Sequence, residues 1–321
     1  GAAARERGVL AVARAAAAAG VTRTTLLPSQ LDMILQQEPD IGKSWNSLGL
    51  IFVSGEPTRP SLVEKFKRCF AGPASPMLIN LFGCTEVAGD VLWAILFNPT
   101  KPRLNSAASG AYSSFAEVPI GYAMGDNGAL LLAAHGADEG ALEQVSAVKQ
   151  VKILGSQNRS VSPKILGVVE APDSSAELYI YGPHLSPGYH HSAQFESEGW
   201  DDRFVNADLA AVRGCSAPGP VRLFRSGDLV KRTLDLHGRP WQRCYLTCTS
   251  NNCDPRPETG LGPDEDAEVC SICKTTRTEA DLPVFVWVGR VDNQVKIRGA
   301  RVELEEVETS LVRLLPPEAV L

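Results

Sequence analysis

A hydroxyl and a carboxylate stand next to each other at Thr85 and Glu86, directly after the mostly apolar run 77–82. A carboxylate is a preferred ligand of Mg²⁺, and a hydroxyl can donate a hydrogen bond to a phosphate oxygen. The other interpretation is structural, with a strand that ends in a glycine turn and two side chains that cap the next element. At the end of a parallel strand, this pair suits a magnesium-bound triphosphate.

A second carboxylate with a possible chemical role is Asp228, in the sequence Phe-Arg-Ser-Gly-Asp-Leu at 224–229. One carboxylate accepts two hydrogen bonds at once, which matches the two neighbouring hydroxyls of a ribose. A lone Gly-Asp pair is also a common turn between strands. Asp228 is therefore a candidate ribose ligand, and its alternative is a turn residue.

The stretch from Gly289 to Glu308 is the most informative part of the chain. Apolar and basic side chains alternate at 295–298, which predicts a short strand, and Gly299 ends it. A helix is predicted to follow, with glutamates in its first turn and Pro316-Pro317 after its end. Its apolar residues recur at helical spacing, at Leu304, Val307, Leu311 and Leu314.

Taken in this order, the motifs resemble those of the adenylate-forming superfamily, which contains acyl-CoA synthetases, luciferases and the adenylation domains of peptide synthetases. The resemblance covers most of the chain from Leu48 onward. The block 87–90 looks most similar to the branch of β-alanine-activating and aminoadipate-semialdehyde-dehydrogenase-like proteins. Further matching segments are Ser-Gly-Glu-Pro at 54–57, Asn-Leu-Phe-Gly-Cys-Thr-Glu at 80–86, and a strand with a glycine turn and a Gly-Tyr pair at 176–182 and 188–189.

The resemblance implies a site for ATP or AMP and for Mg²⁺. Phe82 would stack on the adenine, Asn80 would bond its exocyclic amine, and Glu86 would hold the metal ion. The nucleotide-binding residues implied by the resemblance are Gly55, Glu56, Asn80, Phe82, Gly83, Thr85, Asp228 and Arg290. The catalytic residues that it implies are Thr85, Glu86 and Lys296.

The same resemblance implies a mobile C-terminal part and a thiol acceptor. Asp292 would be the hinge about which the small domain turns, and Gly299 would allow close approach of a pantetheine arm. Some relatives use a lysine at the position of Lys296 in the second half-reaction, and the alternative is a solvated strand lysine. The acceptor would be coenzyme A or the phosphopantetheine of a carrier-protein domain.

The position of Asp90 lines the acyl pocket in adenylation domains. A carboxylate there would repel a plain fatty chain and attract the ammonium group of a substrate. The alternative is an aspartate on a loop that faces solvent. An amino acid is therefore a hypothesis for the substrate, within the broader class of small carboxylic acids.

The chain departs from the family pattern in three places. The glycine-rich phosphate loop that precedes these motifs in family members is not found, and neither is the catalytic lysine near the family's C-terminus. Asp228 and Arg290 are also separated by far more residues than relatives need, because an insertion spans 240–283. The insertion resembles a zinc ribbon only in part, so a disordered loop is the alternative; its cysteines are Cys244, Cys248, Cys253, Cys270 and Cys273.

The expected fold is α/β. Apolar strands that alternate with helices up to about Phe82 predict a parallel sheet, and short strands from about Val118 predict a small barrel-like unit. The expected domains are residues 1–291, the later part of a large AMP-binding domain, and 292–321, the start of a mobile α+β domain. Three histidines, His184, His190 and His191, are interpreted as surface residues.

Composition excludes several other classes of protein. The net charge is −6 and the sequence has no evident basic face, so it gives no support for nucleic-acid binding. No apolar run approaches the roughly 20 residues that a membrane span requires. No secretory signal is visible, and Cys69 and Cys84 are expected to be reduced thiols, so a cytoplasmic location is expected. The chain begins at Gly1 and its first methionine is Met33, which indicates an internal piece of a longer protein.

The expected activity is ATP-dependent activation of a carboxylic acid to an acyl- or aminoacyl-adenylate, followed by transfer to a thiol. The piece alone is expected to be almost inactive, because two phosphate-handling parts are not found in it. One alternative is a degenerate, non-catalytic relative that serves as an interaction module. Another is an oxidative, luciferase-like enzyme.

Overall fold

The computed structural model describes residues 2–70, 72, 74–99, 118–134, 150–156, 164–169, 174–189, 203–209, 219–233, 284–297 and 299–314. The insertion expected at 240–283, its five cysteines and the histidines His190 and His191 lie outside the described residues. None of the helices in the described part of the chain is sufficiently long and apolar to span a bilayer.

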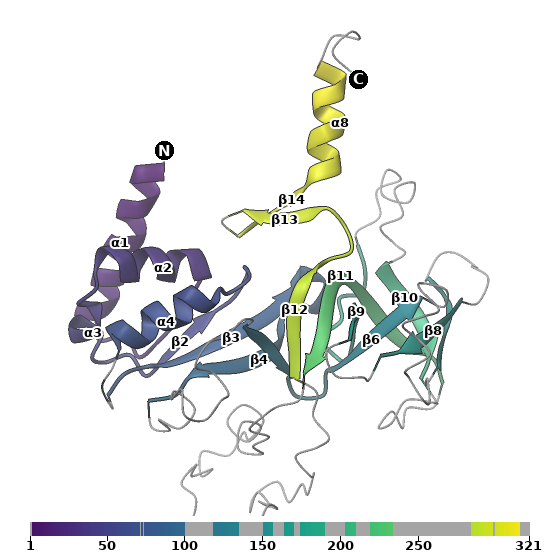
Figure 1. The fold of residues 1–321 in the computed structure, drawn as a ribbon, viewed down its shortest axis with the longest axis horizontal. Coiled ribbons are helices and arrows are strands. Elements are labelled where there is room, and N and C mark those ends of the chain that lie inside the picture. The colour runs from purple at the N-terminus through teal and green to yellow at the C-terminus, as the bar shows by residue number, and fades with distance from the viewer. Residues whose placement is uncertain are drawn as a thin grey trace, which may run out of the picture.

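The first part of the chain alternates helices with parallel strands, as predicted. Strands β1, β2 and β3 pair in parallel, and the helices gather on one face of this sheet (Figure 1). The elements are α1 (Ala2–Ala18), β1 (Arg23–Leu26), α2 (Pro28–Gln37), α3 (Ile41–Ser44), β2 (Leu50–Val53), α4 (Pro60–Cys69) and β3 (Met77–Cys84).

Two of the helices begin at a proline, whose fixed φ suits the first helical turn. Helix α4 buries Leu62, Val63 and Phe66, which follow each other at helical spacing, against the sheet residues Ile51 and Leu78. Full burial of each large apolar side chain contributes about 1.5–3 kcal/mol. This core therefore fixes the edge of the sheet at which β2 and β3 end.

The sheet stops being parallel after β3. A short 3₁₀ turn (Thr85–Val87) leads into β4 (Gly89–Phe97), which pairs antiparallel with β3. The chain reverses sharply because Ala88 and Gly89 both have positive φ, at 56° and 115°. The alternative interpretation of Asp90, an aspartate on a loop that faces solvent, is thus wrong, since Asp90 belongs to β4 and is partly buried.

The predicted barrel-like unit is confirmed. Strands β6 to β11 form a closed six-stranded barrel, because β11 pairs with both β10 and β9. The strands of this half are β5 (Pro119–Ala123), β6 (Gly128–Ala134), β7 (Gln150–Ser156), β8 (Lys164–Val168), β9 (Ser175–Tyr181), β10 (Phe204–Asp208), β11 (Val221–Thr233) and β12 (Val284–Arg290).

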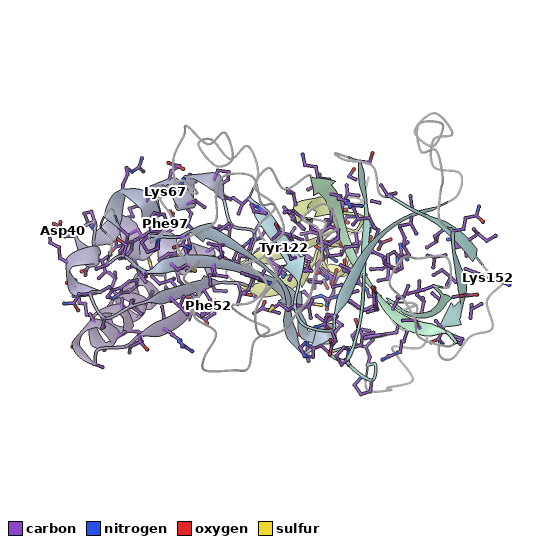
Figure 2. All side chains as sticks on the ribbon, turned by 90° about the horizontal axis from the view of Figure 1, so that it is seen from below. Asp40, Phe52, Lys67, Phe97, Tyr122 and Lys152 are labelled. Atoms are coloured by element: carbon purple, nitrogen blue, oxygen red, sulfur yellow. The ribbon has the colours of Figure 1, made fainter. Side chains whose placement is uncertain are left out.

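Strand β5 joins the two halves. It pairs with β4 on one side and with β12 on the other, so the α/β sheet and the barrel share one twelve-stranded network. Tyr122 of this strand lies between Asp40 at the helical end and Lys152 at the barrel end (Figure 2). The ends of β3 and β11 are consequently held in one hydrogen-bonded framework.

The C-terminal segment departs from the prediction. A hairpin of β13 (Gln294–Ile297) and β14 (Ala300–Glu303) precedes α8 (Leu304–Leu314), whereas a single strand and a helix were expected. Gly299 forms the hairpin turn with a φ of 78°, which favours glycine. The hairpin forms its own two-stranded sheet, and α8 projects beyond it (Figure 1).

Candidate active site

One pocket of about 200 Å³ collects residues from five distant parts of the chain. It lies where β2 and β3 end, opposite β11, β12 and the β13–β14 hairpin. Ligands commonly bind outside the carboxyl ends of parallel strands, so the location is typical of α/β folds. Its lining residues are Gly55, Gly83, Cys84, Thr85, Glu86, Arg203, Phe224, Ser226, Asp228, Arg290, Gln294, Lys296, Gly299 and Arg301.

Glu86 is the most buried carboxylate of this pocket, with 4% of its surface exposed. Its Oε1 accepts hydrogen bonds from the hydroxyl of Tyr189 at 2.6 Å and from Nη1 of Arg301 at 2.8 Å. The turn that carries it follows Gly83, where a Cβ atom would stand 1.8 Å from the carbonyl oxygen of Gly89. Only a glycine permits this close approach of β3 and β4.

These contacts keep Glu86 ionised. Burial alone would raise the pKa of this carboxyl, but the hydrogen bonds from Tyr189 and Arg301 outweigh burial and hold the pKa below its ordinary value. The pKa of Tyr189 is raised, first by burial and then by the carboxylate it faces. Burial also raises the pKa of Cys84 to about 12, so this thiol remains protonated and is a poor nucleophile.

Glu86 fits the role of one protein ligand to Mg²⁺. Its second oxygen, Oε2, is buried and has no hydrogen-bond partner among the described residues. The described part of the chain contains no group of three or more His, Cys, Asp or Glu side chains that could hold a metal ion. Mg²⁺ usually takes one or two protein carboxylates and completes its shell with waters and substrate phosphates, so a single carboxylate with a spare oxygen suffices.

Asp228 and Arg290 form the opposite wall of the pocket. Oδ1 of Asp228 accepts hydrogen bonds from Nη1 of Arg290 at 2.9 Å and from the indole Nε1 of Trp287 at 3.0 Å. No donor in the described part of the chain bonds Oδ2. One oxygen is thus used to orient the carboxylate, and the other is open for a ligand.

Arg290 is largely engaged by the protein itself. Its Nε and Nη2 atoms bond the two carboxylate oxygens of Asp292 at 2.6 and 2.7 Å, and Nη2 also bonds the carbonyl oxygen of Ser226 at 3.1 Å. Together with the bond to Asp228, this occupies four of the five N–H groups of the guanidinium. Burial would lower the pKa of Arg290, but the hydrogen bonds that it donates to Asp292 and the negative charge of Asp228 raise that pKa above its ordinary value.

Gly227 makes this arrangement possible. Its φ of 77° lies in the left-handed region, and a Cβ atom at this position would stand 2.7 Å from both Nη2 of Arg290 and Oδ2 of Asp292. The pairing of β11 with β9 is irregular between Arg225 and Leu229. Gly227 and Asp228 are therefore parts of a bulged strand, which aims the Asp228 carboxylate at Arg290.

The structure brings seven of the expected site residues into the pocket, namely Gly55, Gly83, Thr85, Glu86, Asp228, Arg290 and Lys296. Asn80, Phe82, Glu56 and Asp90 do not line it. Asn80 is 3% exposed. Its side-chain amide accepts a hydrogen bond from the hydroxyl of Thr58 and donates one to the carbonyl oxygen of Pro119.

Phe82 packs at the edge of the core cluster that contains Val87 and Phe224. The carboxylate of Glu56 accepts a hydrogen bond from the backbone of Ser29 at 3.1 Å. Asp90 accepts a hydrogen bond of 2.6 Å from the hydroxyl of Ser54, so it faces the loop after β2. The expected hinge residue, Asp292, adjoins the pocket through Arg290.

Three site residues were missed in the sequence. Arg203, at the start of β10, lines the pocket and bonds Asp292 at 3.1 Å. Tyr189 was noted only as part of a Gly-Tyr pair, and Arg301 was given no role. Each acts across a large sequence separation, so no local pattern identified it.

We compared this chain with proteins of known sequence and structure. The chain is 24% identical over 294 residues to enterobactin synthase component F of Escherichia coli (strain K12), which covers 90% of this chain but 14% of that protein. The adenylation domain AlmE of Vibrio cholerae, solved with glycyl-adenosine-5'-phosphate, is 20% identical with a TM-score of 0.51. PA1221, a peptide-synthetase protein with adenylation and PCP domains, is 17% identical with a TM-score of 0.56.

Both solved structures share the fold over 95% of this chain, which spans 38% and 40% of their lengths. The chain therefore corresponds to a part of such proteins. The family model for AMP-binding enzymes matches residues 3–190, which is more than half of the chain. This chain belongs to the AMP-binding enzyme family.

Proposed function

We propose that this chain is the nucleotide-handling part of an adenylation domain, which activates a carboxylic acid with ATP and passes the acyl group to a thiol. The observation that carries the proposal is the meeting of Glu86, Asp228 and Arg290 in one pocket, although they lie far apart in sequence. The family match and the relatives support the same reaction class.

In the first half-reaction, a carboxylate oxygen of the substrate attacks the α-phosphorus of ATP. The bond from that phosphorus to the bridging oxygen breaks, pyrophosphate leaves, and an acyl-adenylate forms. The thiol sulfur then attacks the acyl carbon, the thiol loses its proton, and AMP leaves with the acyl–oxygen electron pair. Such phosphoryl chemistry depends mainly on positioning and on neutralisation of charge.

Asp228 would bind the two ribose hydroxyls. Its Oδ2 is open, while Trp287 and Arg290 orient the carboxylate through Oδ1. Arg290 was expected to contact the ribose or the phosphates, and it retains one N–H for that purpose. We assign Arg290 a positioning role toward Asp228 as well. Phe82 and Asn80 remain proposed adenine contacts that would need a rearrangement of their present packing.

Thr85 and Glu86 would act at the phosphates. The Thr85 hydroxyl would donate to a phosphate oxygen, and Glu86 would hold Mg²⁺, which supplies neutralisation of the triphosphate charge when bound. The lowered pKa of Glu86 keeps the carboxylate ionised for that role. Lys296 lines the same pocket and would act in the thiol-transfer step.

We propose an amino acid as the substrate. AlmE was solved with a glycyl adenylate, and PA1221 is a peptide-synthetase protein with adenylation and PCP domains, which supports this class. Asp90 would meet the substrate ammonium, and its hydrogen bond to Ser54 holds it beside the loop after β2. A β-alanine-activating branch, suggested by residues 87–90, falls within the same class of substrate.

The thiol acceptor would be a carrier-protein phosphopantetheine or coenzyme A. The PCP domain of PA1221 supports the carrier, and Gly299 at the pocket would let a pantetheine arm approach closely. We propose that the chain divides into two domains, residues 1–291 and 292–321, with Asp292 as the hinge between them. We also propose a cytoplasmic location, as expected from the sequence.

The test is ATP–pyrophosphate exchange by the full-length protein, screened across amino, aryl and fatty acids. Glu86→Gln and Asp228→Asn should each lower exchange at least about tenfold, because each removes a charged contact worth about 1.5–3 kcal/mol. Arg14→Gln, which breaks an exposed ion pair with Glu38 far from the pocket, is the matched control. Exchange that is unchanged in both site variants, or absent with every acid, contradicts the proposal.

A further inference from the structure

Arg222, on β11, is a partly buried arginine that pairs with no carboxylate among the residues that the structure describes. Burial lowers the pKa of its guanidinium, and its Nε is buried without a hydrogen-bond partner in the same part of the chain. A charge placed in this way costs free energy, which its remaining contacts must offset.

Those contacts hold the segment 182–189, which follows β9 and is called the 182–189 loop below. Nη1 of Arg222 donates a hydrogen bond to the carbonyl oxygen of Ser186, and Nη2 donates one to the carbonyl oxygen of Pro187 at 2.7 Å. The guanidinium also lies over the ring of Phe204, with Cζ 4.3 Å from the ring centroid. The planar fork of the arginine thus binds two successive carbonyl groups of the loop.

The 182–189 loop contacts Glu86 at two points. The backbone N–H of Ser186 donates a hydrogen bond to the carbonyl oxygen of Glu86 at 2.8 Å, and the hydroxyl of Tyr189 donates one to Oε1 at 2.6 Å. The ring of Tyr189 also packs against Phe204, with the two centroids 5.6 Å apart. Arg222 therefore binds the same loop residue and the same aromatic ring that hold Tyr189 and the Glu86 backbone in place.

Strand β11 places Arg222 on the side of the pocket without making it part of the lining. Side chains two residues apart share one face of a strand, so Arg222 shares its face with Phe224, which lines the pocket. Phe224 is in turn directly opposite Phe204 in the register of β10 and β11. Arg222 itself is not a lining residue, so an effect of this arginine on the pocket passes through the loop.

We infer that Arg222 is a positioning residue for the proposed reaction, because it fixes the 182–189 loop and thereby keeps the hydroxyl of Tyr189 on Glu86. Without the arginine, the two loop carbonyls turn to water and the loop loses its fixed distance from the Glu86 backbone. The carboxylate of Glu86 then lacks one of the hydrogen bonds that orient it. The inference rests on the proposed function, in which Glu86 acts at the phosphates.

The experiment is a double-mutant cycle of Arg222→Gln and Tyr189→Phe, measured as ATP–pyrophosphate exchange by the full-length protein. Each single variant should raise the KM for ATP at least about tenfold, because each removes the hydrogen bond from Tyr189 to the charged Glu86. The double variant should be no worse than Tyr189→Phe alone, since both substitutions remove the same contact. Arg222→Lys keeps the charge but not the planar fork, so its KM should lie between those of the wild type and Arg222→Gln.

Amide hydrogen exchange of the 182–189 loop provides a second readout that needs no catalysis. The amide of Ser186 should exchange at least about tenfold faster in Arg222→Gln than in the wild type, because its bond to Glu86 opens more often. Arg14→Gln, the same substitution in an exposed ion pair, should match the wild type in both measurements. Unchanged hydrogen exchange in Arg222→Gln and Arg222→Lys, or losses that simply add in the double variant, overturn the inference.

The two proposals fail in different ways. A wild-type KM for ATP in Arg222→Gln overturns the positioning role and leaves the proposed function intact. A wild-type protein that exchanges no pyrophosphate with any acid contradicts the proposed function, whereas faster hydrogen exchange in Arg222→Gln still supports the hold of Arg222 on the loop.

Discussion

Asp228 and Arg290 meet across neighbouring strands β11 and β12 at 2.9 Å, although 62 positions separate them in the chain. The two residues are also directly paired in the strand register. The contact therefore does not depend on the insertion between them, because the barrel strands bring both residues together.

Arg290→Lys tests the positioning role of the guanidinium. A lysine has three N–H groups and no planar fork, so it cannot reproduce the four hydrogen bonds that Arg290 donates to Asp228, Asp292 and the carbonyl oxygen of Ser226. We expect a loss of about 2 kcal/mol, or roughly thirtyfold in the KM for ATP, in the exchange assay. Arg14→Lys is the control. An unchanged KM for ATP would show that Asp228 is oriented without Arg290.

Tyr189→Phe should change the pH dependence of the reaction. The hydroxyl helps to lower the pKa of Glu86, so its removal raises that pKa. If the carboxylate must be ionised, activity is lost as pH falls through this pKa, and the variant should lose exchange at higher pH than the wild type. Tyr179→Phe, which removes the hydroxyl of another largely buried tyrosine with no contact to Glu86, is the control.

The same variant has a predicted effect on stability. A carboxyl whose pKa is lowered on folding contributes stability above its unfolded pKa and loses it as pH falls toward the folded value. Tyr189→Phe should therefore reduce the free energy of unfolding at neutral pH by about 1–2 kcal/mol, with a smaller difference in acid. Equal losses at neutral and acidic pH would show that the hydroxyl acts independently of the Glu86 charge.

Gly227→Ala should destabilise the protein and disturb the pocket. The residue would adopt a φ of 77° with its Cβ atom against Arg290 and Asp292, so we expect a cost of about 3 kcal/mol in the free energy of unfolding. Gly125→Ala has a similar φ of 55° but open space around the new atom, and should cost about 1 kcal/mol. Urea unfolding measures both losses. If the two variants lose similar free energies of unfolding, the predicted collision of the Cβ atom with Arg290 and Asp292 is ruled out.

Asp90→Ala tests the proposed amino-acid substrate. The variant should lose at least about tenfold in its preference for an amino acid over the analogue without the amino group, because an ion pair with the substrate ammonium is removed. Pyrophosphate exchange with both compounds measures this preference. Asp126→Ala, an exposed aspartate in a turn, is the control. The hypothesis is wrong if both acids are activated in the original ratio.

Phe66→Ala tests the core beneath the sheet. Phe66 is fully buried, and its ring lies 4.6 Å from that of Phe70 and 5.5 Å from that of Phe97, measured between centroids. Its truncation should cost about 3–5 kcal/mol in the free energy of unfolding. Val12→Ala, at an exposed position, should cost less than about 0.5 kcal/mol in the same denaturation experiment.

The α/β half could be predicted because local signals determine it. Pro28 and Pro60 begin helices whose apolar residues recur at helical spacing, and the apolar run 77–82 forms most of β3, which ends directly before Thr85. The order of the motifs indicated which carboxylates share a pocket. These features depend on neighbouring residues, so one sequence is enough to recognise them.

The features that the sequence did not predict depend on contacts between distant segments of the chain. Arg203 and Arg301 look like ordinary charged residues until the barrel and the hairpin bring them to Asp292 and Glu86. The strand 300–303 was missed because its alternating residues run straight into the amphipathic pattern of α8. The burial of Asn80 also has no local signal, since its partners Thr58 and Pro119 lie 22 and 39 positions away.

The indole of Trp287 has a practical use that follows from its bond to Asp228. Of the five tryptophans in the chain, this one touches the carboxylate proposed to receive the ribose, and its ring is only partly buried. Its emission should respond when a nucleotide displaces water from that carboxylate. A change in this emission on addition of ATP would report occupancy of the pocket without an added label.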